Sequence, residues 1–214
     1  MKRLLLLLCL SAVLQVQQGY GQDSSSKVSF LFSPALLVPS TAAAQGGVQL
    51  RLGKRWSLLA EGAFPVFHPQ NTDYEKVSYW RTGLEVKHYL SMQKTVRYIS
   101  LQNNFLFREL ENGDGVYYSR TQTFAYTNAV IKSPVLSSAI KLGLEVPLGR
   151  RIYFDLFTGA GLRWIFNKYK TETALVTSIQ PNKQDFFKYD DAWAYNYTLT
   201  RIHLTAGLRF GIRL

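Results

Sequence analysis

The sequence contains a single cysteine, Cys9, which lies within an apolar run near the start of the chain. The rest of the chain has no cysteine, so it can contain no disulfide, no thiol nucleophile and no cysteine-based metal site. Acidic residues are also scarce, with 14 against 25 lysines and arginines, and the formal net charge is +11. Because an exported chain seldom meets nucleic acid, we expect no nucleic-acid partner and take an anionic membrane surface as the counterpart of this charge.

Long apolar runs are absent after the first segment, so a membrane-spanning structure in the rest of the chain must be built from strands. The first segment has the parts of a secretory signal peptide: Lys2 and Arg3, the apolar run Leu4–Leu14, and small residues before Gln22. A lipoprotein signal is disfavoured because Cys9 lies inside the apolar run. The predicted organisation is a signal peptide at 1–21, a short N-terminal segment at 22–26 and one domain at 27–214.

What the sequence contains instead is a regular alternation of apolar and polar residues, most clearly in Arg201–Leu214. There every even position is apolar and every odd position is polar, cationic or glycine. This period of two is typical of a β-strand whose two faces meet different surroundings. Seven further segments show it: Val28–Val38, Ala44–Leu52, Trp56–Val66, Tyr79–Leu90, Arg97–Glu109, Val135–Leu148 and Ile152–Phe166. The alternation therefore predicts an all-β fold with eight strands.

The connections between these segments are short on one side and mostly long on the other. The short ones are Gly53–Arg55, Ser91–Thr95 and Gly149–Arg151, and the long ones are Phe67–Ser78, Leu110–Pro134 and Asn167–Thr200. This asymmetry and the even strand number are typical of outer-membrane barrels. We therefore predict an eight-stranded antiparallel up-and-down transmembrane β-barrel, in which the first strand, Val28–Val38, pairs with the last, Arg201–Leu214.

The alternative is a soluble β-sandwich or small lipocalin-like barrel, in which the apolar face points inward. Glycines on the polar face, such as Gly143, Gly159 and Gly207, favour the membrane barrel. They are poor choices for a solvated strand surface and suit a crowded lumen. Aromatic residues near the strand ends favour it too, because interfacial belts bound the apolar band of membrane barrels. The predicted belts contain Trp56, Trp80, Tyr153, Trp164, Phe166 and Phe210.

The polar face of the predicted strands carries charges of both signs. In a closed lumen we expect these charges to pair, because an unpaired buried charge costs several kcal/mol. The lumen candidates are Arg51, Glu61, Arg81, Glu85, Lys87, Lys141, Glu145, Asp155, Arg163 and Arg209. Such a network forms either a structural polar plug or the gate of a narrow, porin-like pore.

Two hairpin turns carry a resemblance to known proteins: Leu52–Leu58 (LGKRWSL) and Leu148–Arg151 (LGRR). They look like the LGKRW turns of an uncharacterised family of short exported barrels. The chain as a whole resembles the small outer-membrane β-barrels of Gram-negative bacteria, of the eight-stranded OmpA/OmpX type. The resemblance implies location in the cell outer membrane and a monomer inserted by the barrel-insertion machinery. It also implies outer-membrane lipids and lipopolysaccharide as partners.

Sequence motifs for chemistry are weak. No phosphate-binding loop or zinc motif is present, and His68, His88 and His203 fall on different faces or ends of the strands, so we predict no metal and no cofactor. Barrels of this type also include lipid A deacylases and acyltransferases, which makes an enzyme the alternative. Such a site needs a serine, a histidine and a carboxylate near the outer rim. His203 with Asp190 or Asp191 is the nearest candidate, and no spacing singles it out.

We therefore expect a non-enzymatic protein that stabilises the envelope or presents its long loops to an extracellular ligand. Aromatic side chains in these loops are candidates for binding carbohydrate, lipopolysaccharide or a protein surface. They are Tyr117, Tyr118, Tyr189, Trp193, Tyr195 and Tyr197. The competing explanation is that these residues cover strands that protrude above the membrane and anchor the rim.

Overall fold

The computed structural model describes residues 27–34, 43–65, 76–92, 95–113, 115–119, 122–171, 174–177 and 198–214. The predicted signal peptide and the segment at 22–26 lie outside these ranges. The elements of four or more residues that the described residues form are all β-strands. None of their elements is a helix long and apolar enough to cross a membrane.

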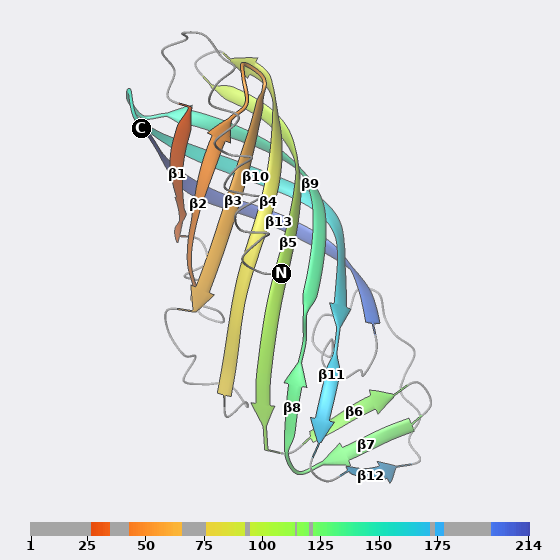
Figure 1. Cartoon of the computed structure of the whole chain (residues 1–214). Coiled ribbons are helices and arrows are strands. Elements are labelled where there is room, and N and C mark those ends of the chain that lie inside the picture. Colours follow the sequence, from red (N-terminus) through yellow and green to blue (C-terminus); the bar gives the residue numbers. More distant parts are fainter. Residues whose placement is uncertain are drawn as a thin grey trace, which may run out of the picture.

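Eight strands close into one antiparallel barrel (Figure 1). In order around the ring they are β1 (Val28–Ser33), β2 (Ala43–Arg51), β3 (Trp56–Pro65), β4 (Lys76–Met92), β5 (Val96–Asn112), β9 (Val135–Pro147), β10 (Ile152–Phe166) and β13 (Thr198–Arg213). The ring closes where β1 pairs with β13, from Ser29 opposite Arg213 to Phe32 opposite Phe210. The predicted all-β barrel of eight strands, with its first and last strands paired, is confirmed.

The strand ends differ from the prediction by a few residues in most cases. The largest difference is β1, which ends at Ser33, whereas the alternation extends to Val38; residues 35–42 lie outside the described ranges. The strands β4 and β5 are the longest, with 17 residues each. In the turn between β2 and β3, Gly53 has a φ of 92°, a conformation that favours glycine.

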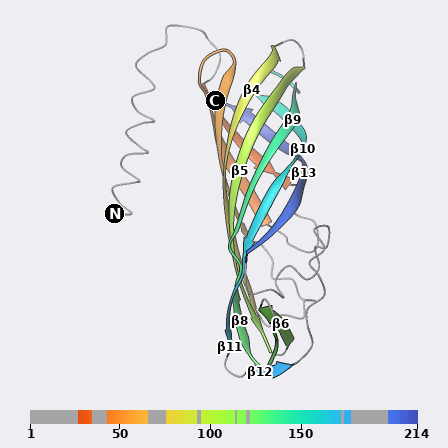
Figure 2. The ribbon, with the colours of Figure 1, turned by 90° about the vertical axis from the view of Figure 1, so that its right-hand side faces the viewer.

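Five short strands lie within two connections that the sequence indicated as loops. They are β6 (Gly115–Ser119), β7 (Gln122–Tyr126), β8 (Ala129–Lys132), β11 (Lys168–Thr171) and β12 (Ala174–Thr177). Strand β8 pairs with the end of β5 and with β11, and these pairings continue the barrel wall. Strands β6, β7 and β12 form a separate sheet. We call these five strands, together with the end of β5 that pairs with β8 (residues 109–112), the extension. It lies at the end of the molecule opposite the C-terminus and the short turns (Figures 1 and 2).

The barrel wall carries apolar side chains outside and charged ones inside. Along β13, Leu204 faces outward with 70% of its surface exposed, whereas Arg209 faces inward with 1% exposed. Large apolar side chains are exposed on all eight strands, among them Phe64, Leu90 and Leu142. The lumen instead holds mainly charged and polar groups, such as Glu85 at 0%, with a few apolar side chains, such as Leu59 at 0%. The alternative with an apolar interior is therefore wrong for this barrel.

The charged lumen of the barrel as the candidate functional site

Arg209 lies at the centre of the lumen and contacts three carboxylates. Its Nε is 2.8 Å from Glu61 Oε1, its Nη2 is 2.7 Å from Glu85 Oε2, and its Nη1 is 3.1 Å from Asp155 Oδ2. These carboxylates come from β3, β4 and β10, while Arg209 is on β13. The planar guanidinium offers five N–H donors, so one side chain can join strands on opposite sides of the barrel.

Two lysines extend this network. Lys87 Nζ lies 2.8 Å from Asp155 Oδ2 and 3.1 Å from Glu145 Oε1, and Lys141 Nζ lies 3.1 Å from Glu85 Oε2. All three cations and all four carboxylates of the network are at most 9% exposed. Removing one partner of such a buried pair leaves the other charge uncompensated, at a cost of about 3–5 kcal/mol.

Neutral donors bind the remaining lone pairs of the carboxylates. Tyr98 donates to Asp155, Tyr89 donates to Glu145 over 3.0 Å, and Ser100 donates to Glu85 over 2.6 Å. Gln45 and Gln102 donate to the two oxygens of Glu61 over 2.8 and 3.0 Å. Because every carboxylate has both a cation and a neutral donor, the network satisfies the main requirement for burying charge.

Of the ten charged residues named from the sequence, seven belong to this network: Glu61, Glu85, Lys87, Lys141, Glu145, Asp155 and Arg209. The other three lie around it. Arg81 donates to Gln45, which in turn donates to Glu61. Arg51 lies over the ring of Tyr89, with 4.8 Å between its Cζ and the ring centroid. Arg163 lies farther along the barrel, opposite Arg201 of β13.

Tyrosines fill the part of the lumen beside the short turns, which corrects the prediction for Tyr153. This residue was expected in an aromatic belt, but it is 1% exposed and faces inward, as Tyr89 and Tyr98 do. Its position follows from the pleat, since Tyr153 is two residues before the inward Asp155. The glycine opposite makes room: a Cβ on Gly211 would lie 2.1 Å from Tyr153 Cζ. Gly143 accommodates Tyr98 in the same way.

The other predicted belt residues lie on the outward side of the wall. Trp56 and Trp80 are exposed, and Trp80 packs against the rings of Phe105 and Phe107. Phe210 packs edge-on against Phe154, with ring centroids 4.6 Å apart. Trp164 and Phe166 occupy the end of β10 farthest from the short turns. The outward aromatics therefore lie toward both ends of the barrel.

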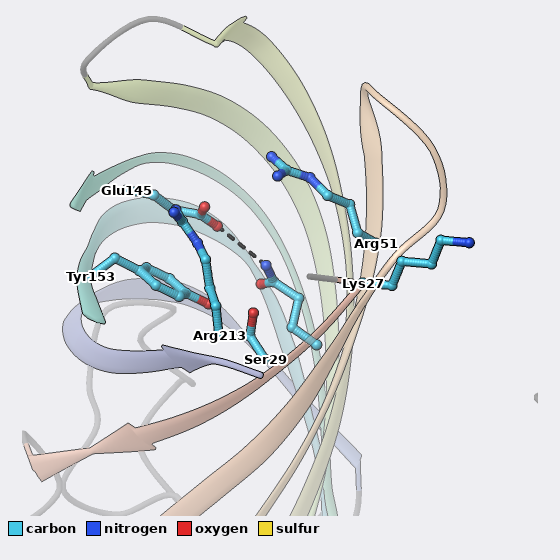
Figure 3. A pocket seen from close by; sticks show the side chains of 7 residues that line it. Lys27, Ser29, Arg51, Glu145, Tyr153 and Arg213 are labelled. Atoms are coloured by element: carbon cyan, nitrogen blue, oxygen red, sulfur yellow. Dashed lines mark hydrogen bonds between the residues drawn. The ribbon is translucent and has the colours of Figure 1, made fainter. Parts of the chain in front are cut away.

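Figure 3 shows the lumen at the end beside the short turns. There Gln49 Nε2 donates a 3.4 Å hydrogen bond to Glu145 Oε1. The space that remains is lined by Lys27, Ser29, Gln49, Arg51, Glu145, Tyr153 and Arg213. Its volume is about 10 Å³, which is room for about one water molecule. Side chains therefore occupy this end of the lumen and leave no room there for a larger ligand.

The extension has an apolar core of its own. Leu110, Tyr126, Ala129 and Ile131 are buried together, and Tyr117 packs against them. The ring of Tyr117 also stacks on Phe124, with 4.9 Å between centroids. The structure thus places the predicted binding residue Tyr117 in a packing role. The side chain of Tyr118 and all of Tyr189, Trp193, Tyr195 and Tyr197 lie outside the described residues.

The histidines are not gathered into one site in the part of the chain that the structure describes. No group of three or more His, Cys, Asp or Glu side chains there is placed to hold a metal ion. His88 packs on Trp56, with ring centroids 4.4 Å apart. The charged groups close to His203 are the cations Arg163, Lys141 and Arg81. His68 and the candidate carboxylates Asp190 and Asp191 lie outside the described ranges.

Sequence reasoning missed the neutral members of the network, among them Tyr89, Gln49 and Gln102. All of them lie on the same strand faces as the charged residues, so the alternation along each strand could have identified them as lumen residues. Their partners could not be found in that way, because the partners lie on strands that are distant in the sequence.

Comparison with known proteins identifies a family and no named relative. No curated protein and no solved structure matches the chain. A family model described as "Protein of unknown function (DUF3575)" matches residues 4–192, which is most of the sequence. The chain, an eight-stranded barrel with a charged lumen, therefore belongs to this DUF3575 family.

Proposed function

We propose that the protein is an integral outer-membrane barrel of the OmpX type, which spans the bilayer without conducting and supports the extension outside the cell. The observation that carries this proposal is the polarity of the wall. Apolar side chains such as Leu204 are exposed on the outside, while Arg209 and its partners are buried inside. In a bilayer the outward side chains contact lipid, and the closed ring leaves no strand edge unpaired within the barrel.

Strand length and charge support the membrane location. A tilted membrane strand needs about 9–11 residues, and β9, β10 and β13 have 13, 15 and 16. The short turns carry Lys54, Arg55, Arg150 and Arg151, which would lie at the headgroups of the periplasmic leaflet. Each basic residue near an anionic surface contributes about 1 kcal/mol. The long connections and the extension then face the outside.

The lumen supports a role without conduction. An interior of eight strands is just wide enough to be filled by side chains. Here ion pairs cross it from β13 to β3, β4 and β10. The network therefore acts as a structural plug, and the protein functions through its outer surfaces. We assign it an envelope-stabilising or surface-interaction role, in which the extension is a rigid platform because it has its own core.

The membrane location is tested by expressing the full chain and fractionating the cells. We expect the protein in the outer-membrane fraction, with faster migration on a gel when unheated than when boiled, because the folded barrel resists detergent. An equal amount of boiled sample is the control. A product that remains in the soluble fraction with no mobility shift would overturn the proposal.

The role of the extension is tested by removing the β6–β7 hairpin. Asn112 and Ala129 are paired across β5 and β8, so residues 113–128 can be replaced by an Asn-Gly turn. We expect the variant to retain its heat-modifiable migration and to lose adhesion to surfaces or partner cells. A variant that adheres as the wild type does would locate the role in another part of the protein. The enzymatic alternative is tested by incubating both proteins with lipopolysaccharide and looking for a mass change in lipid A by mass spectrometry.

A further inference from the structure

We propose that an apolar groove on the outward face of the barrel binds one anionic phospholipid, with the lipid phosphate at Arg97 and an acyl chain in the groove. The groove crosses β5, β9 and β10 from the end of β4 to the middle of β13, and its volume is about 570 Å³. Volumes of about 300–1,000 Å³ are typical of small-molecule sites. The inference rests on the proposed membrane location, since the groove meets lipid only there.

Two small side chains create the hollow. Thr158 of β10 and Ala206 of β13 lie opposite each other across the strand pair, and both face outward. Leucines surround them: Leu142 lies opposite Thr158, and Leu144 lies opposite Leu156 in the neighbouring row. At Thr158 and Ala206 no long side chain covers the backbone, so the wall is recessed between leucine side chains. The lining is almost wholly apolar, which suits an acyl chain.

A cation lies at one end of this groove. Arg97 is the second residue of β5, its side chain is exposed, and it lines the groove beside Leu90. Among the residues that the structure describes, none forms an ion pair with Arg97. A guanidinium binds phosphate oxygens through two parallel hydrogen bonds. The groove therefore has a phosphate-binding end and an acyl-binding body, as a phospholipid requires.

The charge of the short turns and the position of the groove indicate which class of lipid binds. The short turns at this end carry Lys54, Arg55, Arg150 and Arg151, and neither the turn at 52–55 nor the turn at 148–151 contains a carboxylate, which favours an anionic over a zwitterionic headgroup. The groove runs from the short-turn end to the middle of the barrel, so it lies within the leaflet on that side. The phosphates of lipopolysaccharide, in the opposite leaflet, would be far from Arg97. The occupant is thus a phospholipid of the periplasmic leaflet.

The proposal is tested with the purified full chain in detergent, mixed with phosphatidylglycerol and phosphatidylethanolamine in equal amounts. Native mass spectrometry then counts the lipids bound to each barrel. We expect one phosphatidylglycerol bound in preference, with binding weakened at least about tenfold in R97Q, the effect of losing a charge-assisted hydrogen bond. A206L and T158L fill the groove from two strands and should each prevent binding. K132Q is the matched control, because it removes an exposed cation in the extension, at the other end of the barrel from the groove.

Heat-modifiable migration of the same samples separates this inference from the proposed function. If the barrel folds and inserts but shows no preference for phosphatidylglycerol, or if R97Q and K132Q weaken binding equally, the lipid site is overturned while the membrane location stands. A wild-type dimer that A206L converts to a monomer would overturn it as well, because the groove would then hold a second copy of the chain. Failure of the wild type to insert would contradict both proposals.

Discussion

The barrel and the extension share the continuous strand β5, yet their polarity is opposite. Along β5, the inward face carries the polar Gln102 in the barrel and the buried Leu110 in the extension. The outward face changes in the other direction, from the exposed Leu101 to Glu109, which lies 3.6 Å from Lys132. The extension is thus built as proteins in water are built, with an apolar core and a charged surface.

This comparison locates a boundary on the molecule. The polarity of β5 reverses between Gln102 and Leu110, which is where the surroundings of the wall are expected to change from lipid to water. The same sequence alternation therefore produces a polar core on one side of the boundary and an apolar core on the other. A long strand can serve both regions because its backbone hydrogen bonds do not depend on which face is polar.

The largest expected effect is at the centre of the polar core. R209M removes the cation that joins Glu61, Glu85 and Asp155, and we expect a loss of about 3–5 kcal/mol in the free energy of unfolding. This loss is measured by unfolding the protein with urea in detergent micelles, with heat-modifiable migration on a gel reporting the fraction that remains folded. R151M, on an exposed turn, is the control and should change stability little. Equal stability of the two variants would contradict the role of the network.

A charge on the outward face distinguishes the two regions directly. L204K places a lysine on the exposed apolar wall, where it should cost about 2–4 kcal/mol if lipid covers that position. V130K makes the same kind of change on β8 of the extension, beside the existing Lys132, and should cost less than about 0.5 kcal/mol. Urea unfolding in lipid vesicles compares them. Similar values for both variants would place the boundary elsewhere.

A cavity in the apolar core should affect the extension alone. I131A removes side-chain atoms packed against Leu110 and Tyr126, and a substitution of this kind costs about 2–4 kcal/mol. Because the barrel has a separate core, we expect the variant to keep its heat-modifiable migration while a protease cleaves the extension faster. Intact protease resistance, or loss of the folded barrel, would show that the two regions are not independent.

The smallest effect concerns conduction. E145Q removes one of the two carboxylates that contact Lys87, while the contacts of Arg209 with Glu61, Glu85 and Asp155 remain. We therefore expect conductance in planar bilayers to stay near zero, as for the wild type. E85Q, which removes a contact to Arg209 itself, is the stronger test of the plug. A clear rise in conductance in either variant would support the gated pore.

How far the sequence predicted these regions depended on strand length. In the barrel, strands such as β13 alternate over many residues, so the number of strands and the placement of Leu204 and Arg209 on opposite faces followed from the period alone. In the extension, β8 and β11 have only four residues each, which is too short for a period to be distinguished from a loop. The prediction for Tyr153 is wrong because the pleat decides which face a residue occupies, and nearness to a strand end does not.

The sequence by itself determined the all-β class, the eight strands, which residues of a strand share a face, and the pairing of the first strand with the last. Those features are local or follow from strand order, because side chains alternate along any strand. Only the tertiary structure decided which side chains meet. Arg209 and Glu61 are 148 residues apart, and the recess at Thr158 and Ala206 requires two strands in one register. Such contacts depend on how the strands are staggered around the closed ring, and no single strand carries that information.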